Sequence, residues 1–462
     1  MSGHKGSARI CYKKTTGNNP FPSPHFYHKR KNILQGYHTI PYMRVKKFFS
    51  GFCLLTLSIT CSWGESYKDM IRRDRGTVSG EYYHYIYKPS PISAPPKGYK
   101  PFFISHYGRH GSRYHSDSRY MDQAIAPLLK ADSLHILTPE GKALLKDLQT
   151  LLSMHQGHFG MLSELGINEQ QDIARRMYGN FPEVFNGKRH HILCSSSLYP
   201  RCLASMANFM SSLQQNASGM IARMYCSDEL QKTIAPNTDM TETYRKETLM
   251  EDSLRKAICP PDSSFKRWLT IPKKGWELTD NPYLWMKNII NAVSVVYNLD
   301  NAPDILKYFT TAELESLWVA RNMRFHYCFA MSTESPESTR NLCINVIREI
   351  IQETDSLLAD TSQVAAHFRF GHDTIVLPLG AYIGIEGLDG RDSALQAKNH
   401  FNCTESVCMA TNLQLVFYKN KKGDILVKCL YNESERHIHA LGSQEGFYYK
   451  WKDLREYLKS LL

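Results

Sequence analysis

The chain has 462 residues, of which 42% are hydrophobic, and its 56 Lys and Arg against 44 Asp and Glu give a formal net charge of +12. This composition is that of a globular protein and excludes a disordered, a collagen-like or a multi-span membrane protein. The length allows roughly two to three domains of about 150 residues each. An excess of basic residues is common in proteins that bind nucleic acids or acidic membranes, so its position along the chain matters.

The positive charge is concentrated at the start of the chain. Residues 1–64 carry ten basic residues and no acidic one, which leaves 46 basic against 44 acidic residues in the remainder. That remainder is close to neutral and has no basic stripe of the kind that binds a phosphate backbone. We therefore expect no nucleic-acid partner.

The same segment has the pattern of a secretory signal peptide beginning at Met43. Basic residues are followed by an apolar stretch over 48–60 and by small residues before a cut after Gly64. The apolar stretch is too short to span a bilayer. We expect a leader and signal peptide over 1–64, export to the periplasm or the exterior, and no membrane span after cleavage. A lipoprotein cleavage before Cys61 is the disfavoured alternative.

Export makes disulfide bonds possible. Nine cysteines follow the predicted cleavage site; the number is odd, so at least one stays unpaired within the chain. Their spacings do not resemble those of a zinc site. Cys403 and Cys408 are the favoured local pair, and we expect buried free thiols for most of the others.

After an irregular lead-in expected over 65–100, short apolar runs predict three buried strands, at 102–105, 190–194 and 364–370. Helices are predicted between them. Thr138 and Pro139 have the residue types of a helix N-cap and first turn, and an apolar face follows.

The second half of the chain contains further helix and hairpin signals. Thr310 with Glu313 forms a predicted capping box, and apolar residues from Leu342 to Leu357 recur at helical spacing. Two later apolar runs, 413–418 and 425–430, flank a Gly-containing turn and predict a hairpin.

Strands alternating with helices predict an α/β fold. We expect an open, mostly parallel sheet flanked by helices over residues 101–462. An inserted α-helical lobe is expected at about 115–190 and 206–360, where the pattern is mostly helical.

Charged and polar residues follow all three predicted strands: Arg109, His110 and Arg113 after the first, Arg201 after the second, and His372 and Asp373 after the third. Ligands of an open α/β sheet bind beyond the carboxyl ends of its strands, so we expect these clusters to meet at one crevice. Guanidinium groups match the oxygens of a phosphate and stabilise its transition state, while an imidazole can attack phosphorus. A carboxylic acid can protonate the leaving oxygen. The sequence has neither a Walker loop nor an acidic metal cluster, so we predict no metal and no cofactor.

Arg-His-Gly-Ser-Arg at 109–113, together with His-Asp at 372–373, resembles the histidine acid phosphatases, branch 2 of the histidine phosphatase superfamily. The resemblance spans about residues 100–455. Leu137-Thr-Pro-Glu-Gly141 and the closing strand pair with Leu430-Tyr-Asn-Glu433 are most similar to the multiple inositol polyphosphate phosphatases. The resemblance implies an exported phosphomonoesterase for inositol polyphosphates, with 2,3-bisphosphoglycerate as a further candidate substrate.

By position, the resemblance makes His110 the phosphorylated nucleophile and Asp373 the proton donor. Arg109, Arg113, Arg201 and His372 would bind the phosphate. Two departures stand out: His115 replaces the family's usual Pro, and Thr374 stands where the inositol polyphosphate branch has the Glu of His-Ala-Glu. The donor role therefore falls to Asp373, as in bacterial phytases and glucose-1-phosphatases. The clustered arginines should keep His110 neutral even in mild acid.

Other interpretations remain open. A lone Arg-His-Gly is often a turn at a strand end, but three arginines and two histidines beside apolar strands are costly to bury without an anion. Arg201 is the favoured third phosphate-binding arginine, and the alternatives are Arg175, Arg176 and Arg189, which are nearby in the sequence. A broad acid phosphatase, a glucose-1-phosphatase, a phosphoglycerate-mutase-type transferase and an inactive phospholigand-binding protein are the alternative functions. We expect a monomer whose partner is a phosphorylated small molecule.

Overall fold

The computed structural model describes residues 66–442 and 445–462; the predicted leader and signal peptide lie outside them. The strands are β1 Lys100–Arg109, β2 His191–Ser196, β3 Ile221–Tyr225, β4 Val364–Gly371, β5 Asn412–Lys419, β6 Ile425–Tyr431, β7 Ser434–Glu435 and β8 Tyr448–Lys450. The helices are α1 Tyr67–Arg73, the 3-10 helix η1 Arg75–Tyr82, α2 Arg119–Ser133, α3 Pro139–His155, α4 Glu164–Asn180, α5 Pro182–Phe185, α6 Pro200–Asn216, α7 Asp228–Ile234, α8 Thr241–Ile258, α9 Asp262–Trp268, α10 Pro282–Val293, α11 Thr311–Phe329, α12 Pro336–Leu358, α13 Asp373–Tyr382, α14 Cys403–Ser406 and α15 Trp451–Ser460.

The strands form one mixed sheet in the order β3-β2-β4-β1-β5-β6-β7, with β8 paired to β6. β1, β2, β3 and β4 run parallel to one another. The strands from β5 onward pair antiparallel, because β5 and β6 form the predicted hairpin, whose turn contains Gly423 at φ +90°. The predicted α/β fold class is confirmed, with the parallel pairing confined to one half of the sheet.

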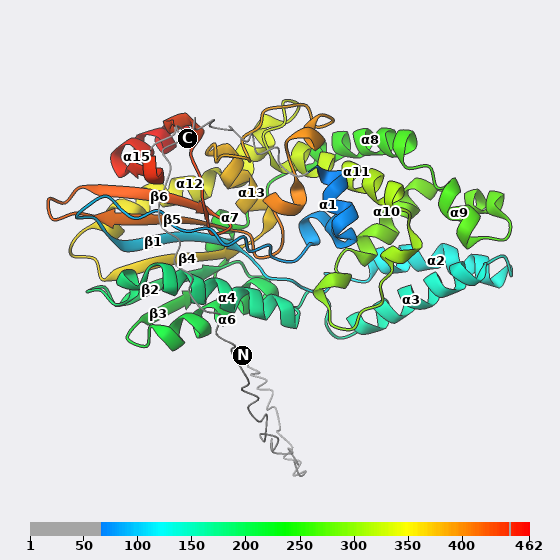
Figure 1. Cartoon of the computed structure of the whole chain (residues 1–462), viewed down its shortest axis with the longest axis horizontal. Helices are drawn as coiled ribbons and strands as arrows, with labels where there is room; N and C mark the ends of the chain where they lie inside the picture. Colours follow the sequence, from blue (N-terminus) through cyan, green and yellow to red (C-terminus); the bar gives the residue numbers. More distant parts are fainter. Residues whose placement is uncertain (1–65, 443–444) are drawn as a thin grey trace, which may run out of the picture. The chain divides into compact units, whose positions relative to one another are not determined.

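Helices cover both faces of the sheet (Figure 1). α4 and α6 lie on one face, and α12, α13 and α15 lie on the other. Successive residues of β1 accordingly enter two different cores: Phe103 packs into the α12 and α13 side, and Ile104 packs into the α4 and α6 side. A strand buried on both faces has a continuous apolar run, which is the signal that identified β1 and β4 in the sequence.

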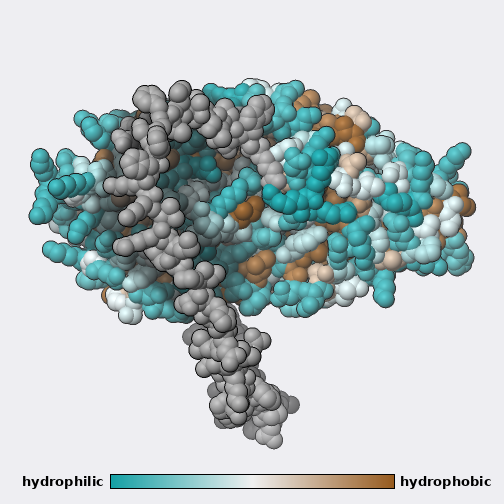
Figure 2. Space-filling model, in the orientation of Figure 1, coloured by the Kyte–Doolittle hydropathy of each residue, from teal (hydrophilic) through white to brown (hydrophobic). Residues whose placement is uncertain are grey.

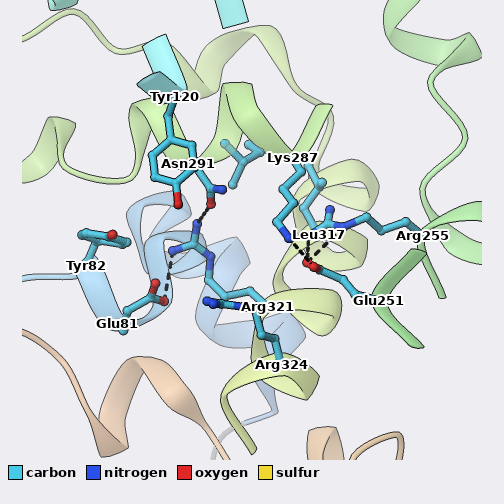
Figure 3. A pocket seen from close by; sticks show the side chains of 11 residues that line it. Glu81, Tyr82, Tyr120, Glu251, Arg255, Lys287, Asn291, Leu317, Arg321 and Arg324 are labelled. Atoms are coloured by element: carbon cyan, nitrogen blue, oxygen red, sulfur yellow. Dashed lines mark hydrogen bonds and ion pairs between the residues drawn. The ribbon is translucent and has the colours of Figure 1, made fainter. Parts of the chain in front are cut away.

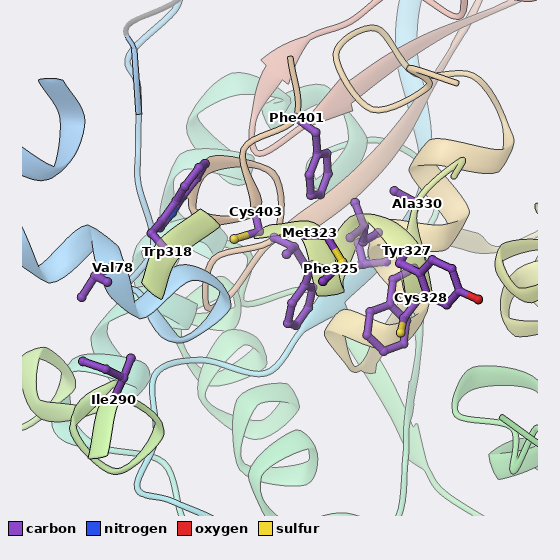
Figure 4. Close-up of a cluster of buried hydrophobic side chains, with 14 of the residues drawn as sticks. Val78, Ile290, Trp318, Met323, Phe325, Tyr327, Cys328, Ala330, Phe401 and Cys403 are labelled. Atoms are coloured by element: carbon purple, nitrogen blue, oxygen red, sulfur yellow. The ribbon is translucent and has the colours of Figure 1, made fainter. Parts of the chain in front are cut away.

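The remaining helices, mainly α2, α3, α8, α9, α10 and α11, form a helical lobe beside the sheet (Figure 1). Helices α4 and α12, which also lie in the ranges expected for an inserted lobe, cover the faces of the sheet instead. α11 begins with the predicted capping box of Thr310 and Glu313. Its apolar side chains, including Trp318 and Met323, are buried among neighbouring elements (Figure 4). The Trp318 indole donates a hydrogen bond of 2.9 Å to Thr404 Oγ1, which fixes the helix against α14.

Two segments differ from the prediction. The irregular lead-in expected over 65–100 is helical at α1 and η1, because Met70, Ile71 and Val78 are buried in the core and Tyr67 stacks on Trp318. The range expected to be helical also contains the strand β3. This edge strand is mostly exposed, so it lacks the apolar pattern of a buried strand.

The predicted Cys403–Cys408 disulfide is not formed, and the nine cysteines in the described part of the chain are all free thiols. The two side chains lie in different surroundings: Cys403 lies against Gly80, whereas Cys408 Sγ lies 3.6 Å from Thr411 Oγ1. Seven of the nine thiols are buried, as expected for most of them.

The face in Figure 2 is mainly polar, and its apolar side chains occur in small separate groups. Isolated exposed apolar residues of this kind are normal on globular proteins. Within residues 66–442 and 445–462, the helices include none with the length and apolar character that a membrane crossing requires.

Candidate active site

The three predicted clusters follow adjacent parallel strands. Arg109 of β1 is opposite Gly371 of β4, and Ser196 of β2 is opposite Phe370 of β4. Parallel strands in this register end at the same edge of the sheet. The residues that follow them therefore project from one edge, and the rings of His110 and His372 lie with centroids 5.7 Å apart.

His110 is buried, and its ring orientation leaves one nitrogen available for chemistry. Nδ1 lies 2.9 Å from the carbonyl oxygen of Gly111. A carbonyl can only accept, so Nδ1 carries the proton of the neutral ring and Nε2 keeps its lone pair. Burial lowers the pKa of His110 far below its usual value, and the charges of Arg201, Arg109 and Arg113 lower it further. The ring is thus neutral in mild acid, as expected.

Arg109 is fully buried and is held in place by main-chain oxygens. Its Nη1 donates to the carbonyls of Glu81 at 2.5 Å and Val407 at 2.6 Å, and its Nη2 lies 3.0 Å from Asp373 Oδ2. These contacts leave Nε without a hydrogen-bond partner in the described part of the protein. The guanidinium is therefore rigid and has a free N–H group.

Arg113 and Arg201 are held differently, by aromatic rings. Arg113 Cζ lies 5.2 Å from the centroid of Tyr82, and Arg201 Cζ lies 4.6 Å from that of Tyr199. Among the described residues, the buried Nε of each arginine has no hydrogen-bond partner. Arg113 Nη1 also donates to the Tyr114 carbonyl at 2.8 Å, but the Nε–H of each guanidinium remains free to bind an anion.

His372 and Asp373 occupy the N-terminus of α13, His372 as the N-cap. His372 Nε2 lies 3.2 Å from Ser197 Oγ, and the His372 ring meets Tyr199 edge-on at 4.9 Å. Burial, assisted by Arg201, lowers the pKa of His372 to about 3. Burial raises the pKa of the Asp373 carboxyl, but Arg109 and His372 outweigh that effect and hold it below its usual value.

Helix α4 supports the loop that contains His110. The buried Glu169 carboxylate accepts hydrogen bonds from Ser112 N at 2.7 Å, Ser112 Oγ at 2.8 Å and Tyr85 N at 2.8 Å. Gln170 Nε2 donates to the Arg109 carbonyl at 3.1 Å. A β-carbon on Gly111 would lie 2.4 Å from a main-chain oxygen of α4, so only glycine allows this close approach.

Several residues of the site were not singled out in the sequence. Ser197 and Tyr199 contact His372, and Tyr82 lies under Arg113. Ser197 and Tyr199 stand within the polar segment after the second predicted strand, so their position was a usable signal. Tyr82 lies in the segment predicted to be an irregular lead-in, and only the tertiary structure brings it to the site.

The structure assigns other partners to the arginines that competed with Arg201. Arg176 donates to Glu433 at 2.9 and 2.7 Å, and Arg175 pairs with Asp172. Arg189 precedes β2, at the far end of that strand from Arg201, and donates to main-chain oxygens around the end of α12. Of these four arginines, Arg201 is the one whose charge acts on His110.

One group of potential metal ligands occurs among the described residues, formed by Glu349, Glu353 and His367. The Arg369 guanidinium contacts both carboxylates, at 2.6 and 3.3 Å, so its positive charge already neutralises part of the charge that a metal ion would. This group shares no residue with the candidate active site.

A family model agrees with the geometry. The model of the histidine phosphatase superfamily (branch 2) matches residues 108–432, which include all of the predicted site residues. The chain belongs to this family. The resemblance seen in the sequence and the predicted enzyme class, a histidine acid phosphatase, are both confirmed.

Relatives of this histidine phosphatase include multiple inositol polyphosphate phosphatase 1 of Gallus gallus, which is 25% identical over an alignment of 333 residues that covers 65% of this chain and 69% of the relative. A Bifidobacterium longum multiple inositol polyphosphate phosphatase in complex with inositol hexasulfate has a TM-score of 0.68 at 15% identity, covering 83% of this chain and 97% of that chain. The phytase from D. castellii has a TM-score of 0.66 at 14% identity, and the match covers 84% of this chain and 85% of the phytase chain. At these identities the two structures show a shared fold.

Proposed function

We propose that this histidine phosphatase is an exported phosphomonoesterase that hydrolyses inositol polyphosphates through a phosphohistidine intermediate. His110 is the nucleophile, Asp373 the proton donor, and Arg109, Arg113, Arg201 and His372 bind the phosphate. The observation that carries the proposal is the set of three arginines around a neutral His110 whose buried Nε–H groups have no partner among the described residues. Burying cations whose N–H donors have no acceptor costs free energy unless an anion such as phosphate binds to them.

The first step transfers the phosphoryl group to His110. Nε2 attacks phosphorus with its lone pair while the bond from phosphorus to the ester oxygen breaks, and Asp373 passes to that oxygen a proton that its carboxylate takes from the bound monoanionic ester. The guanidinium groups stabilise the charge on the transferring phosphoryl oxygens. The Nδ1–H to Gly111 hydrogen bond holds the ring in the required tautomer and stabilises the cationic phosphohistidine.

The second step releases the product. Water attacks the phosphorus of the phosphohistidine, the bond from nitrogen to phosphorus breaks, and the Asp373 carboxylate takes a proton from the water. Inorganic phosphate leaves, and His110 returns to its neutral form with Nδ1 still protonated. Asp373 passes the proton from the water to the departing phosphate, so the two steps together use one water and return every group to its starting form.

Two observations support the substrate class. The Gallus gallus relative is a multiple inositol polyphosphate phosphatase, and the fold is shared with a Bifidobacterium longum enzyme of that name and with a phytase. Export is supported by the signal-peptide pattern beginning at Met43. N-terminal sequencing of the exported protein should find Glu65 as the first residue; retention of the segment before it would contradict export.

Trapping of the phosphoenzyme tests the mechanism. Substrate labelled in its phosphate is mixed with the protein and quenched within milliseconds in alkaline denaturant, in which a phosphohistidine survives. We expect label on His110 in the wild type and neither label nor turnover in His110→Ala. The thermal unfolding profile of the variant should match that of the wild type. His158→Ala, which removes an exposed imidazole, is the matched control and should retain both. A phospholigand-binding protein would give no covalent label.

A phosphate-release assay tests the substrate class. Inositol hexakisphosphate, 2,3-bisphosphoglycerate and glucose 1-phosphate are compared at equal concentrations. We expect the highest kcat/KM with inositol hexakisphosphate. A preference for glucose 1-phosphate, or equal values for all three, would favour a glucose-1-phosphatase or a broad acid phosphatase instead.

A further inference from the structure

The helical lobe contains a small cavity beside the candidate active site. Its volume is about 90 Å³, and side chains from η1, α2, α8, α10 and α11 line it. Charged residues form much of the wall, namely Glu81, Glu251, Arg255, Lys287, Arg321 and Arg324. Figure 3 shows Arg255, Lys287 and Glu251 converging on one side and Arg321 reaching Glu81 and Asn291 on the other.

The wall carries more positive than negative charge. Glu251 accepts from both Arg255 and Lys287, and Glu81 Oε2 accepts from Arg321 at 3.0 Å. Four cations thus share two carboxylates in the wall. A third carboxylate, Glu247, lies behind the wall with Oε2 3.5 Å from Arg324 Nε, and burial raises its pKa to about 7, so protonation removes its charge in mild acid.

Arg255, in this wall, has a buried donor that makes no hydrogen bond within the described part of the protein. Arg255 is only 4% exposed, and its Nη1 has no hydrogen-bond partner among the described residues. Its Nε and Nη2 both point to Glu251. An arginine that leaves one amino group free in a buried wall lacks an acceptor of the kind that an anion supplies.

The cavity shares two residues with the surroundings of the active site. The Glu81 carbonyl holds Arg109, while its carboxylate holds Arg321. The Tyr82 ring lies near both Arg113, at 5.2 Å, and Arg321, at 5.6 Å. One residue pair therefore separates the guanidinium groups around His110 from those of the cavity, so a ligand with two phosphates could contact both sets.

We propose that this cavity binds a second phosphoryl group, supplied either by the substrate's next phosphate or by free inorganic phosphate. The first source rests on the proposed function, because it makes the cavity the subsite that favours polyphosphorylated substrates over simple monoesters. A single water needs ~10–15 Å³ on the same scale, so 90 Å³ has room for several waters, a space that one phosphoryl group can occupy. Excess positive charge selects an anion for that space.

Two variants remove a charge from the wall with little disturbance elsewhere. Arg324→Gln removes a side chain that is 33% exposed, and Lys287→Gln leaves Glu251 paired with Arg255. Arg245→Gln is the matched control, because Arg245 lies on α8 with Arg255 but is exposed and pairs with Glu242 outside the cavity. Thermal unfolding profiles establish that all three proteins are folded.

The first measurement is the ratio of kcat/KM for inositol hexakisphosphate to that for p-nitrophenyl phosphate, which has one phosphate. Loss of a charge-assisted hydrogen bond costs on the order of tenfold in affinity or more. We expect the ratio to fall at least tenfold in Arg324→Gln and in Lys287→Gln, and to stay within twofold in Arg245→Gln. That result assigns the cavity to the substrate's second phosphate.

The second measurement is calorimetric titration with inorganic phosphate. Two equivalents bound by the wild type and one by the cavity variants, with an unchanged ratio, would assign the cavity to free phosphate. One equivalent in every protein together with an unchanged ratio would overturn the proposal. If the wild type hydrolyses neither ester, the proposed function fails, and the calorimetric stoichiometry alone decides whether the cavity binds phosphate.

Discussion

Arg109 Nη2 and Asp373 Oδ2 lie 3.0 Å apart and join the end of β1 to the first turn of α13. The pair links the two halves of the proposed chemistry, phosphate binding and proton transfer. With no anion bound, Arg109 favours the ionised carboxyl and lowers its pKa. A bound phosphate competes for the same guanidinium, which weakens its hold on Asp373 and makes the carboxyl easier to protonate.

Replacement of the proton donor should depend on the leaving group. Asp373→Asn keeps the size of the side chain but cannot supply a proton. We expect kcat to fall by 10²–10⁴-fold, the usual range for general acid catalysis, with an alkyl phosphate such as an inositol phosphate. The loss should be much smaller with p-nitrophenyl phosphate, whose leaving group needs no proton. Equal losses with both substrates would remove Asp373 from the donor role.

The pH dependence should favour mild acid. Because Arg109 and His372 hold the Asp373 pKa below its usual value, that carboxyl is ionised in the free enzyme. The proton then arrives with a monoanionic phosphate ester, whose second pKa is about 6. We expect kcat/KM for an inositol phosphate to fall as pH rises above about 6, approaching tenfold per pH unit. A steady-state profile that rises toward alkaline pH would contradict this scheme.

Stability should fall as the solution becomes acidic. Burial lowers the pKa values of His106, His115 and His372 to about 3, and that of His110 far below its usual value. In the unfolded chain each has a pKa of about 6.5. Between pH 6.5 and 3 the unfolded state therefore binds protons that the folded state does not. Each such histidine lowers the free energy of unfolding by up to about 1.4 kcal/mol per pH unit.

His106→Phe isolates one of these contributions. The His106 ring packs against Phe209, Phe368 and Phe370, and its Nδ1 has no hydrogen-bond partner among the described residues, so phenylalanine suits the site. Urea unfolding from pH 4 to 7 should show a shallower pH dependence in the variant, by up to about 1.4 kcal/mol per unit. Parallel curves for the two proteins would show that His106 titrates equally in both states.

Glu169 should stabilise the loop that carries His110. Glu169→Gln replaces an acceptor oxygen with an NH₂ group facing donors on Ser112 and Tyr85. We expect a loss of about 1–3 kcal/mol in the free energy of unfolding, the cost of an unsatisfied buried donor. We also expect a lower kcat, because the loop then holds His110 less firmly. Glu164→Gln, at the exposed start of the same helix, should change neither quantity.

Local signals in the sequence predicted the elements that they define directly. Continuous apolar runs marked β1 and β4, and the Thr310–Glu313 box marked the start of α11. β3 was missed because it is an exposed edge strand, and a strand without a buried face does not have the apolar pattern that identifies a strand in the sequence. The helices α1 and η1 were missed because tertiary burial of residues such as Met70, rather than a strong local pattern, stabilises them.

The sequence by itself determined the fold class, the family and the residue types placed after three strands, since buried strands and short motifs are encoded by neighbouring residues. Only the tertiary structure decided how those residues are arranged. The register of β1, β2 and β4 brings the clusters to one edge, the Gly111 carbonyl fixes the His110 tautomer, and Glu81 and Tyr82 connect the site to the charged cavity of the helical lobe. These contacts join residues far apart in the chain, and their geometry depends on packing that no local pattern specifies.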